Sequence, residues 1–425
     1  MDSAKKRLGS SNYLINNSSK QKNFFKHNYE SHSNFTRYTK KLNFNNNFDF
    51  GMLSSVKLNE EGSYGDIITN LVISFELPDI SSLLTTGGRK VRYSNSIGIS
   101  LFETVELYIG GNMIDRQTPE MIDILSETHF NTHIRNNFDN LVGKFETDDF
   151  DENTNTSGRF YLPLQFWFCR TNVDKQFNLP MFLLYNDLIE LRCKMKTFNQ
   201  VVTNADFNTT DSLGTTLQIS NPNIIVEYIL LDEKERKKML ELSMKETQFF
   251  LINQVQKIQV SVPANSGSFK IELKQLKYLI TQLFWIYKSD NKVASGRHLN
   301  YNYNDSNPLN TVQITFEKQD ATDKQDANYF VLVEPYLNKL NNPRKYIHTF
   351  SFSIDPKMLE QPNGVCNFSE IHNPEIDISF VDNVPVGTLQ IYAINYNVLQ
   401  IRNGKGVLFH NLSKSIKGSL NSNSQ

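Results

Sequence analysis

Short segments of this chain alternate apolar and polar residues, and this period of two constrains the fold more than any other feature of the sequence. In residues 67–77 five of the seven apolar side chains fall at odd positions, namely Ile67, Leu71, Ile73, Phe75 and Leu77. Successive side chains of a β-strand point to opposite faces of the sheet. The segment therefore predicts a strand that is buried on one face and that ends at Pro78.

A second alternating segment, residues 101–109, is followed by Gly110 and Gly111. Glycine readily adopts the positive φ angles that both central positions of a tight two-residue hairpin require. We therefore expect a return strand that begins at Met113. The last apolar run of the chain carries apolar residues on both faces, which indicates an inner strand covered on both sides. The apolar runs that predict further strands are 161–168, 278–287, 311–317, 347–354, 376–380 and 388–402.

Two segments have the features of short helices. Thr118 followed by Pro119 is typical of a helix start, because threonine caps the first free amide groups and proline needs no hydrogen bond there. Residues 232–245 are highly charged and begin with Asp232, and Glu235 three positions later predicts a capping box. We expect this second helix to be an exposed connector.

The many short strands and long loops predict antiparallel β-sandwiches with Greek-key connections. A length of 425 residues leaves room for two or three domains. Trp167 and Trp285 fall one in each half, which suggests one large core aromatic residue in each of two sandwiches. We expect an extended basic arm, a first sandwich, a second sandwich and a flexible tail, at residues 1–47, 48–221, 222–412 and 413–425.

The first 47 residues contain nine lysines and arginines against two acidic residues, although the whole chain has a net charge of −1. That overall balance argues against nucleic acid as a specific partner. The basic groups of the arm would meet phosphate headgroups or an acidic neighbour, and its aromatic residues would anchor it on another surface. A disordered tail without a partner would have the same composition. The candidate contact residues are Lys22, Phe24, Phe25, Lys26, Tyr29, Phe35 and Arg37.

No segment of the sequence completes a catalytic or metal-binding motif. His129 and His133 are four residues apart, but the metalloprotease motif needs a glutamate directly after the first histidine, and this chain has a phenylalanine there. Asp115, Glu120 and Asp123 could form a carboxylate pair, although acidic residues at a helix start are also favoured by the helix dipole. We therefore predict no enzymatic activity, no metal and no cofactor.

The chain has three cysteines, Cys169, Cys193 and Cys366. An odd number without a C-x-x-C pair argues against a disulfide framework and against a zinc site built from thiolates. We expect three small buried side chains in a reducing compartment.

Several segments resemble, in order, the major capsid proteins of nucleocytoplasmic large DNA viruses. The most specific block is YLPLQFWFCRTN (161–172) together with LPMFLLYNDLIEL (179–191). No block would suffice alone, but their order is kept over nearly the whole chain. The other blocks are NFFKHNYESHSNFT (23–36), FNNNFDFG (44–51), VELYIGGNMIDRQTPEMIDI (105–124), LDEKERKKM (231–239), FLINQVQ (250–256), HTFSFSIDPKMLEQPNGVCNFSEIHN (348–373) and YAINYNVLQIRNGKGVLFHN (392–411).

The resemblance implies an all-β fold of two tandem antiparallel eight-stranded jelly rolls with short connecting helices. It also implies a homotrimer whose six jelly rolls form a pseudo-hexagonal capsomer, which tiles an icosahedral virion shell assembled in the host cell cytoplasm. The expected partners are neighbouring capsomers, minor capsid or cement proteins and an internal viral membrane. We expect the arm at residues 1–47 to lie on the inner side of this shell.

Three other functions stay open at the level of the sequence. The chain could be a minor or vertex capsid protein rather than the major one. It could be a glycan amidase with tandem jelly rolls, an enzyme class that uses acidic residues in the cleft between its sandwiches. It could also be a carbohydrate-binding protein, because jelly rolls often bind sugars and the chain has 18 tyrosines.

Overall fold

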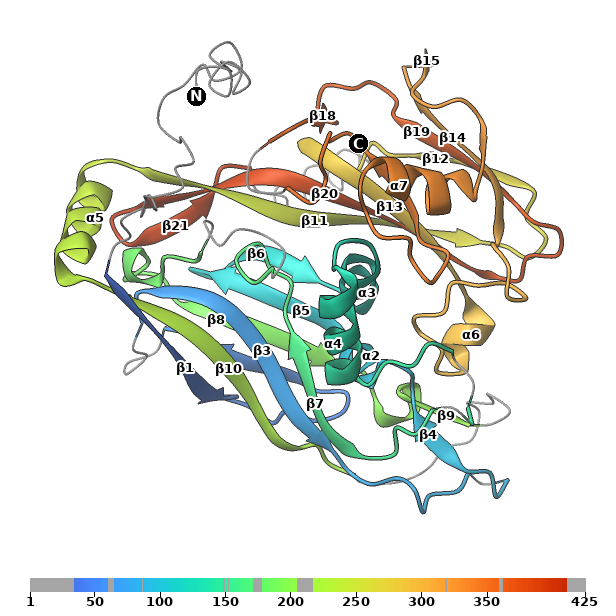
Figure 1. The fold of residues 1–425 in the computed structure, drawn as a ribbon, viewed down its shortest axis with the longest axis horizontal. Coiled ribbons are helices and arrows are strands. Elements are labelled where there is room, and N and C mark those ends of the chain that lie inside the picture. The colour runs from blue at the N-terminus through green and yellow to red at the C-terminus, as the bar shows by residue number, and fades with distance from the viewer. Residues whose placement is uncertain are drawn as a thin grey trace, which may run out of the picture.

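Two β-sandwiches make up the structure, a computed structural model, and they are stacked one on the other (Figure 1). All strand pairs in the four large sheets are antiparallel. The structure describes residues 34–59, 65–85, 87–147, 150–151, 153–170, 178–204, 217–317, 319–358 and 362–410.

The first sandwich has two four-stranded sheets. One sheet contains, in spatial order, β1 (Phe35–Asn43), β10 (Ser220–Leu231), β3 (Ile67–Leu77) and β7 (Gly158–Pro163). The other sheet contains β2 (Leu53–Lys57), β8 (Ile189–Met195), β5 (Phe102–Ile109) and β6 (Asn112–Gln117). A small separate ladder pairs β4 (Val91–Tyr93) with β9 (Val202–Asn204).

The second sandwich repeats this plan. One sheet contains β11 (Gln248–Val262), β20 (Gly387–Arg402), β13 (Leu279–Ser289) and β17 (His348–Ser351), with β18 (Cys366–Asn367) and β21 (Lys405–Leu408) at its sides. The other contains β12 (Ser268–Glu272), β19 (Glu375–Phe380), β14 (Leu309–Phe316), β15 (Gln319–Asp320) and β16 (Gln325–Asp326).

Both sandwiches have the same strand topology. When the main strands of each half are numbered from one to eight along the chain, with β15 and β16 counted together, the two sheets of each half have the orders 1-8-3-6 and 2-7-4-5. This is the strand order of a jelly roll, in which two Greek keys fold into facing sheets. The predicted double eight-stranded jelly roll is therefore confirmed.

The local signals in the sequence place several elements correctly. The strand β3 spans the predicted 67–77, and its odd-numbered residues from Leu71 to Leu77 are buried. The turn between β5 and β6 consists of Gly110 and Gly111, both with positive φ (56° and 77°). The inner strand β20 is buried almost throughout residues 387–397, as its two apolar faces predict.

The helices are short. Thr118 caps α3 as predicted, because its hydroxyl accepts a hydrogen bond from the Met121 amide. The helix at the predicted 232–245 is present, but the capping box is absent, since the Asp232 amide donates to the Asn34 carbonyl instead. The elements are α2 (Ile97–Ser100), α3 (Pro119–Thr128), α4 (Thr132–Val142), α5 (Glu233–Lys245), α6 (Asp290–Ala294) and α7 (Glu334–Leu337), the 3₁₀-helices η1 (Met181–Leu183) and η2 (Phe198–Gln200), and the π-helix η3 (Tyr329–Val333).

Two predicted boundaries are wrong. The strand β1 lies inside the predicted arm of residues 1–47, yet all nine of its residues pair with β10. The predicted division between residues 221 and 222 cuts through β10, which belongs to the first sandwich. The sandwiches are instead joined through α5. Residues 1–33 and 411–425, which contain the rest of the arm and the predicted tail, lie outside the described residues.

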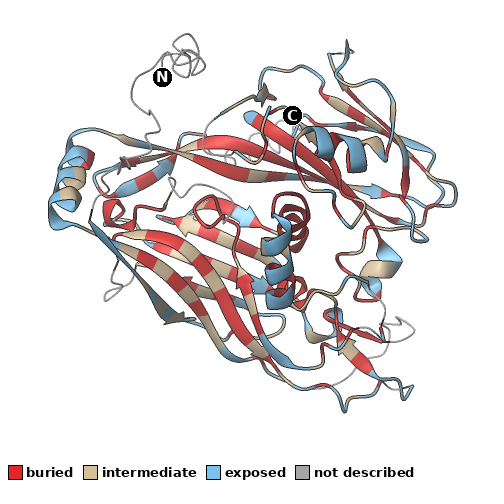
Figure 2. Ribbon diagram, viewed as in Figure 1, coloured by how far each residue is buried: buried red, intermediate tan, exposed pale blue. Residues whose placement is uncertain are grey.

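Each sandwich has an apolar core, and the first core continues into the contact between the sandwiches (Figure 2). Trp167 is buried in the first core and Trp285 in the second, as predicted. The strand β13 serves both cores, since Trp285 points into the second sandwich whereas Phe284 and Ile286 pack with the first. The two faces of β13 therefore pack into different cores, and this shared strand links the two sandwiches.

Candidate assembly surfaces and the joint between the sandwiches

The joint between the sandwiches is formed by the β6–α3 segment of the first and the β11–β20–β13 sheet of the second. Phe284, Ile286, Tyr392 and Ile394 cover the sheet side of this joint, and all four are fully buried. The Tyr392 hydroxyl lies 3.2 Å from the Thr118 hydroxyl at the start of α3. These apolar side chains are thus as buried as those of a domain core, which favours a rigid connection over a hinge.

Acidic side chains on one face of α3 cross this joint. Glu120, Asp123 and Glu127 are spaced three and four residues apart, which places them on the same face of a helix. The Glu120 carboxylate is bonded to the Lys288 ammonium group on β13. Asp123 accepts bonds from Lys345 of the second sandwich at 2.8 Å and from Lys144 of the first at 2.7 Å.

Further ion pairs extend the network to Glu127 and Asp139. Lys144 also lies 2.6 Å from Glu127. The Arg344 guanidinium of the second sandwich bridges Glu127 at 2.8 Å and Asp139 at 2.7 Å. Breaking a buried ion pair leaves an uncompensated charge in a medium of low polarity. The network therefore penalises any relative displacement of the two sandwiches.

The pKa shifts agree with this pairing. Burial alone would raise the pKa of Glu120, but the charge of Lys288, with those of Lys257 and Lys196, outweighs it and holds the pKa well below its usual value. Burial would likewise raise the pKa of Glu127, and the neighbouring Lys144 and Arg344 reverse that effect. Both carboxyl groups are therefore ionised at neutral pH.

Two of the three acids that could have formed a carboxylate pair have cationic partners instead. Glu120 and Asp123 bind the cations of the joint. Asp115 lies elsewhere in the joint, with its carboxylate 3.3 Å from the Val255 amide, and burial raises its pKa to about 7. His129 ends α3 and His133 lies in α4, so the two histidines do not share a helix. Among the described residues, no group of three or more acidic, histidine or cysteine side chains is placed to hold a metal ion.

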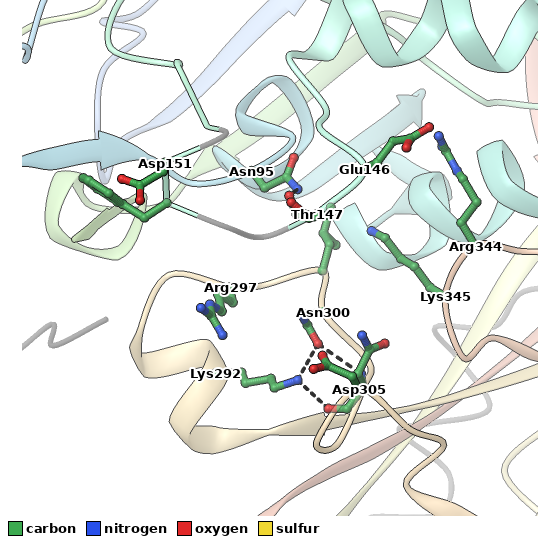
Figure 3. Close-up of a pocket in the computed structure, with 13 residues that line it drawn as sticks. Asn95, Glu146, Thr147, Asp151, Lys292, Arg297, Asn300, Asp305, Arg344 and Lys345 are labelled. Atoms are coloured by element: carbon green, nitrogen blue, oxygen red, sulfur yellow. Dashed lines mark hydrogen bonds between the residues drawn. The ribbon is translucent and has the colours of Figure 1, made fainter. Parts of the chain in front are cut away.

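A polar cavity of about 620 Å³ opens beside the joint (Figure 3). Its lining comes from both sandwiches and includes acidic residues such as Glu146 and basic residues such as Lys292. The Lys292 ammonium group donates to the Asn300 side chain and to the Asn302 carbonyl, both at 2.6 Å. Arg344 and Lys345 also reach the lining, but their charges are engaged by the acids of the joint. The cavity thus presents charges of both signs and no single preferred ligand.

The predicted contact residues are only partly within the described chain. Lys22, Phe24, Phe25, Lys26 and Tyr29 lie outside the described residues. Phe35 and Arg37 lie on β1, which is the edge strand of its sheet within the described residues. Arg37 forms an ion pair with Glu227 on β10, and the Phe35 side chain is half exposed.

The two described contact residues line one groove. Phe35, Arg37, Ile67, Ile229 and Leu231 surround a groove of about 430 Å³ on the outer side of the first sandwich. Partly exposed apolar side chains around such a groove are suited to contact with a protein partner.

The cations of the joint, the cysteines and the helices can each be compared with what the sequence predicted. Lys144, Lys288, Arg344 and Lys345 were not recognised in the sequence, although an acidic stripe on an otherwise apolar helix was a signal that buried cations were needed. The three cysteines form no disulfide bond with one another, and Cys366 is only partly buried, in contrast to the prediction that all three are buried. Each described helix is too short or too polar to span a bilayer.

Two family models match the chain in succession. The model described as "Major capsid protein N-terminus" matches residues 23–232, and the model described as "Large eukaryotic DNA virus major capsid protein" matches residues 235–407. The break between them falls at the start of α5, where the structure divides the two jelly rolls.

Relatives of known function agree with these models. The major capsid protein of Phaeocystis pouchetii virus is 23% identical over 517 residues, which cover 93% of this chain and 96% of that protein. The major capsid protein of Paramecium bursaria Chlorella virus 1 is 25% identical and covers 93% of this chain and 95% of its own length.

Solved structures share the fold. The protein in the quasi-atomic model of the PBCV-1 virus capsid superposes with a TM-score of 0.76 and 23% identity, over 91% of this chain and all of that chain (100%). The Faustovirus major capsid protein gives a TM-score of 0.71 with 12% identity, over 90% of this chain and 93% of that chain. At such low identity the likeness shows the common architecture of the two chains.

Proposed function

This chain belongs to the family of large eukaryotic DNA virus major capsid proteins, and from that premise we propose that three copies form a pseudo-hexagonal capsomer. Its role is structural, as a subunit of the icosahedral shell of a virion. In the proposed capsomer, six jelly rolls from three chains give a nearly sixfold outline. Hexagonal outlines pack side by side without gaps, so neighbouring capsomers are the next partners.

The observation that carries this proposal is the repeated topology of the two halves across a rigid joint. Two like sandwiches can imitate sixfold symmetry in a trimer only if each chain holds them at a fixed angle. The buried apolar contact around Phe284 and the buried ion pairs of α3 support such a fixed angle. A flexible linker would let each chain adopt many outlines, and the capsomers would not tile.

Absence of catalysis is part of the same proposal. The amidase alternative needs free acidic residues between the sandwiches, and three of the acids there, Glu120, Asp123 and Glu127, are bonded to lysines and an arginine. Hydrolysis of an N-glycosylated peptide by the purified protein, lost in the Asp115→Ala variant, would contradict this part of the proposal. A sugar-binding role would require hits on a glycan array.

The arm at residues 1–33 reaches the inner side of the shell and contacts cement proteins or the internal membrane. Six basic residues against two acidic ones in this stretch, with Phe24, Phe25 and Tyr29, support such contacts. Assembly in the host cytoplasm agrees with the lack of a disulfide bond among Cys169, Cys193 and Cys366, since disulfides seldom persist there. Deletion of residues 1–22 is expected to weaken membrane association of the capsomer while leaving trimers intact.

Sedimentation of the full-length protein tests the oligomer. We expect a stable trimer, and electron microscopy should show particles with a hexagonal outline. A protein that stays monomeric at every accessible concentration would refute the capsomer. Copy number in virions separates the major role from a minor or vertex role, because a major subunit must dominate the protein mass.

A further inference from the structure

The end of the β11–β20 sheet that lies beside α5 carries a third strand, β21, and its two faces have different surroundings (Figure 1). One face packs on the first jelly roll, because Leu399, Ile401 and Leu408 are buried in the first core. The Gly406 amide of β21 also donates a hydrogen bond of 2.7 Å to the Asp187 carboxylate of the first jelly roll. This end of the sheet is therefore held in a fixed position.

The opposite face of the same three strands is apolar. Directly paired residues of antiparallel strands project on the same side of a sheet. The ladder continues beyond β21, since the Phe409 amide donates a hydrogen bond of 2.8 Å to the Val398 carbonyl. We call the result the β11–β20–β21 face, and it consists of two rows of residues across the strands: Phe249, Gln400 and Val407 in one, and Leu251, Val398 and Phe409 in the other.

The second sheet of the same sandwich leaves this face uncovered. Its strands are short, with five residues in β12 and eight in β14 against 15 in β11. On β11 the core of the second sandwich begins only at Ile258. Phe249, Val407 and Phe409 are consequently 66%, 53% and 61% exposed. Large apolar side chains gathered on one exposed face mark a contact surface.

The chain reaches the end of its described part beside this face. His410 directly follows Phe409, and its carbonyl accepts a hydrogen bond of 2.7 Å from the Asn397 side chain. The imidazole ring of His410 stacks on the Tyr278 ring, with 4.4 Å between the ring centroids. Whatever follows His410 is therefore tethered next to the face, at an effective concentration on the order of millimolar or above.

The sequence that follows has a composition that suits this face. Residues 411–425 contain three large apolar residues, Leu412, Ile416 and Leu420, and no acidic residue. Their spacing of four places them on one side of a helical segment. The nine residues from 412 to 420 span up to about 30 Å when extended. That length is ample for a face three strands wide, because neighbouring strands lie about 4.8 Å apart.

We propose that residues 412–420 pack across the β11–β20–β21 face of their own chain, with Leu412, Ile416 and Leu420 against its exposed apolar residues. The segment then acts as a cover, in place of the flexible tail that the sequence alone predicts. It keeps the free subunit from associating with other copies through this face. The apolar contacts are set against the entropy of ordering the segment, so the cover is reversible. The inference concerns a single chain and does not depend on the capsomer.

Photo-cross-linking of the full-length protein tests where the segment lies. Phe249→p-benzoylphenylalanine should cross-link to peptides from residues 411–425, in a product with the mass of one chain. The control is Leu53→p-benzoylphenylalanine, since Leu53 is similarly exposed (58%) but lies on β2 of the first sandwich. It should give no cross-link to these peptides. Products that join the segment to a second chain, equal cross-linking at both positions, or none from position 249 would each overturn the proposal.

Trypsin cleavage after Lys414 and Lys417 measures how firmly the segment is held. Each rate is divided by the rate for a synthetic peptide of the same sequence. Phe249→Ser with Phe409→Ser should speed cleavage roughly tenfold, because cleavage of an opening segment follows the population of its open form. Leu53→Ser should leave the rate unchanged. Equal rates in the wild type and the double variant would overturn the proposal.

A variant of the segment itself guards against misfolding of the double variant. Leu412→Ser with Ile416→Ser and Leu420→Ser changes only residues beyond the described sheet, and it should give the same increase in cleavage. This variant should also bind more of the apolar dye 1-anilinonaphthalene-8-sulfonate than the wild type, because the β11–β20–β21 face is uncovered. Unchanged cleavage and unchanged dye binding would show that the segment does not cover the face. A wild type that forms no trimer would contradict the proposed function and leave these results standing.

Discussion

Removing the Lys144 ammonium group should destabilise the protein strongly, although the residue lies in a loop after α4. Its side chain is 2% exposed and contacts Asp123 at 2.7 Å and Glu127 at 2.6 Å. Lys144→Met keeps most of the side-chain volume but leaves two buried carboxylates with one cation fewer. Loss of one partner from a buried ion pair costs about 3–5 kcal/mol. In a domain of this size that is a fall in Tm of roughly 6 °C or more.

The matched control is Lys194→Met. Lys194 pairs with Glu103 at 2.8 Å, but both side chains are about half exposed (51% and 50%). Surface pairs of this kind contribute about 0–1 kcal/mol. Differential scanning calorimetry on both variants therefore compares the same chemical change in a buried and in a solvated pair.

The pH dependence separates charge from packing. In the wild type the folded-state pKa values of Asp123 and Glu127 are lowered, so the stability from their pairing is present above the unfolded values near 4 and is lost as pH falls below them. The difference in Tm between wild type and Lys144→Met should therefore shrink towards pH 3. A Lys144→Met variant no less stable than Lys194→Met, or a difference that does not depend on pH, would refute this account of the joint.

Two further predictions concern the same interior. His129 and His298 have pKa values lowered to about 3, and His348 to about 4, mainly because of burial. Their unfolded pKa is near 6.5, so the free energy of unfolding falls as pH drops below that value, by roughly 3 kcal/mol per histidine at pH 4.5. Asp115, with its pKa raised to about 7, partly offsets this fall. His348→Gln should show a smaller fall in Tm between pH 7 and 4.5, and an unchanged fall would contradict the reasoning. Phe284→Ala should lower the free energy of unfolding by about 3–5 kcal/mol. It should also make the segment between the sandwiches more sensitive to limited proteolysis than in the wild type. Equal resistance would show that the joint does not depend on this ring.

Most of the strand pattern could be predicted from the sequence, and the exceptions have clear causes. The strand β1 (FTRYTKKLN) was assigned to the arm because it is an edge strand with one largely exposed face, so polar residues dominate it. The predicted capping box of α5 is absent because the Asp232 amide donates its hydrogen bond to the carbonyl of a distant residue, Asn34. Local rules describe neighbours along the chain, and both errors arise from neighbours in space.

The joint between the sandwiches also separates what could be predicted from neighbours along the chain from what depends on neighbours in space. The sequence placed Glu120 and Asp123 on a helix, since threonine, proline and the helical period act over a few residues. It could not show that Lys288, Arg344 and Lys345 neutralise that helix, because these partners are more than 160 positions away. Phe35 and Arg37 were selected from composition and found beside one groove, whereas the apolar β11–β20–β21 face was not recognised.

The sequence by itself determined the alternation of strands, the Gly-Gly hairpin and the sandwich class, because backbone geometry converts a period of two into a strand with one buried face. Only the tertiary structure decided which surfaces of the two jelly rolls meet and which are left uncovered. That outcome depends on side chains brought together from distant segments, where burial makes each unpaired charge costly and each apolar contact favourable.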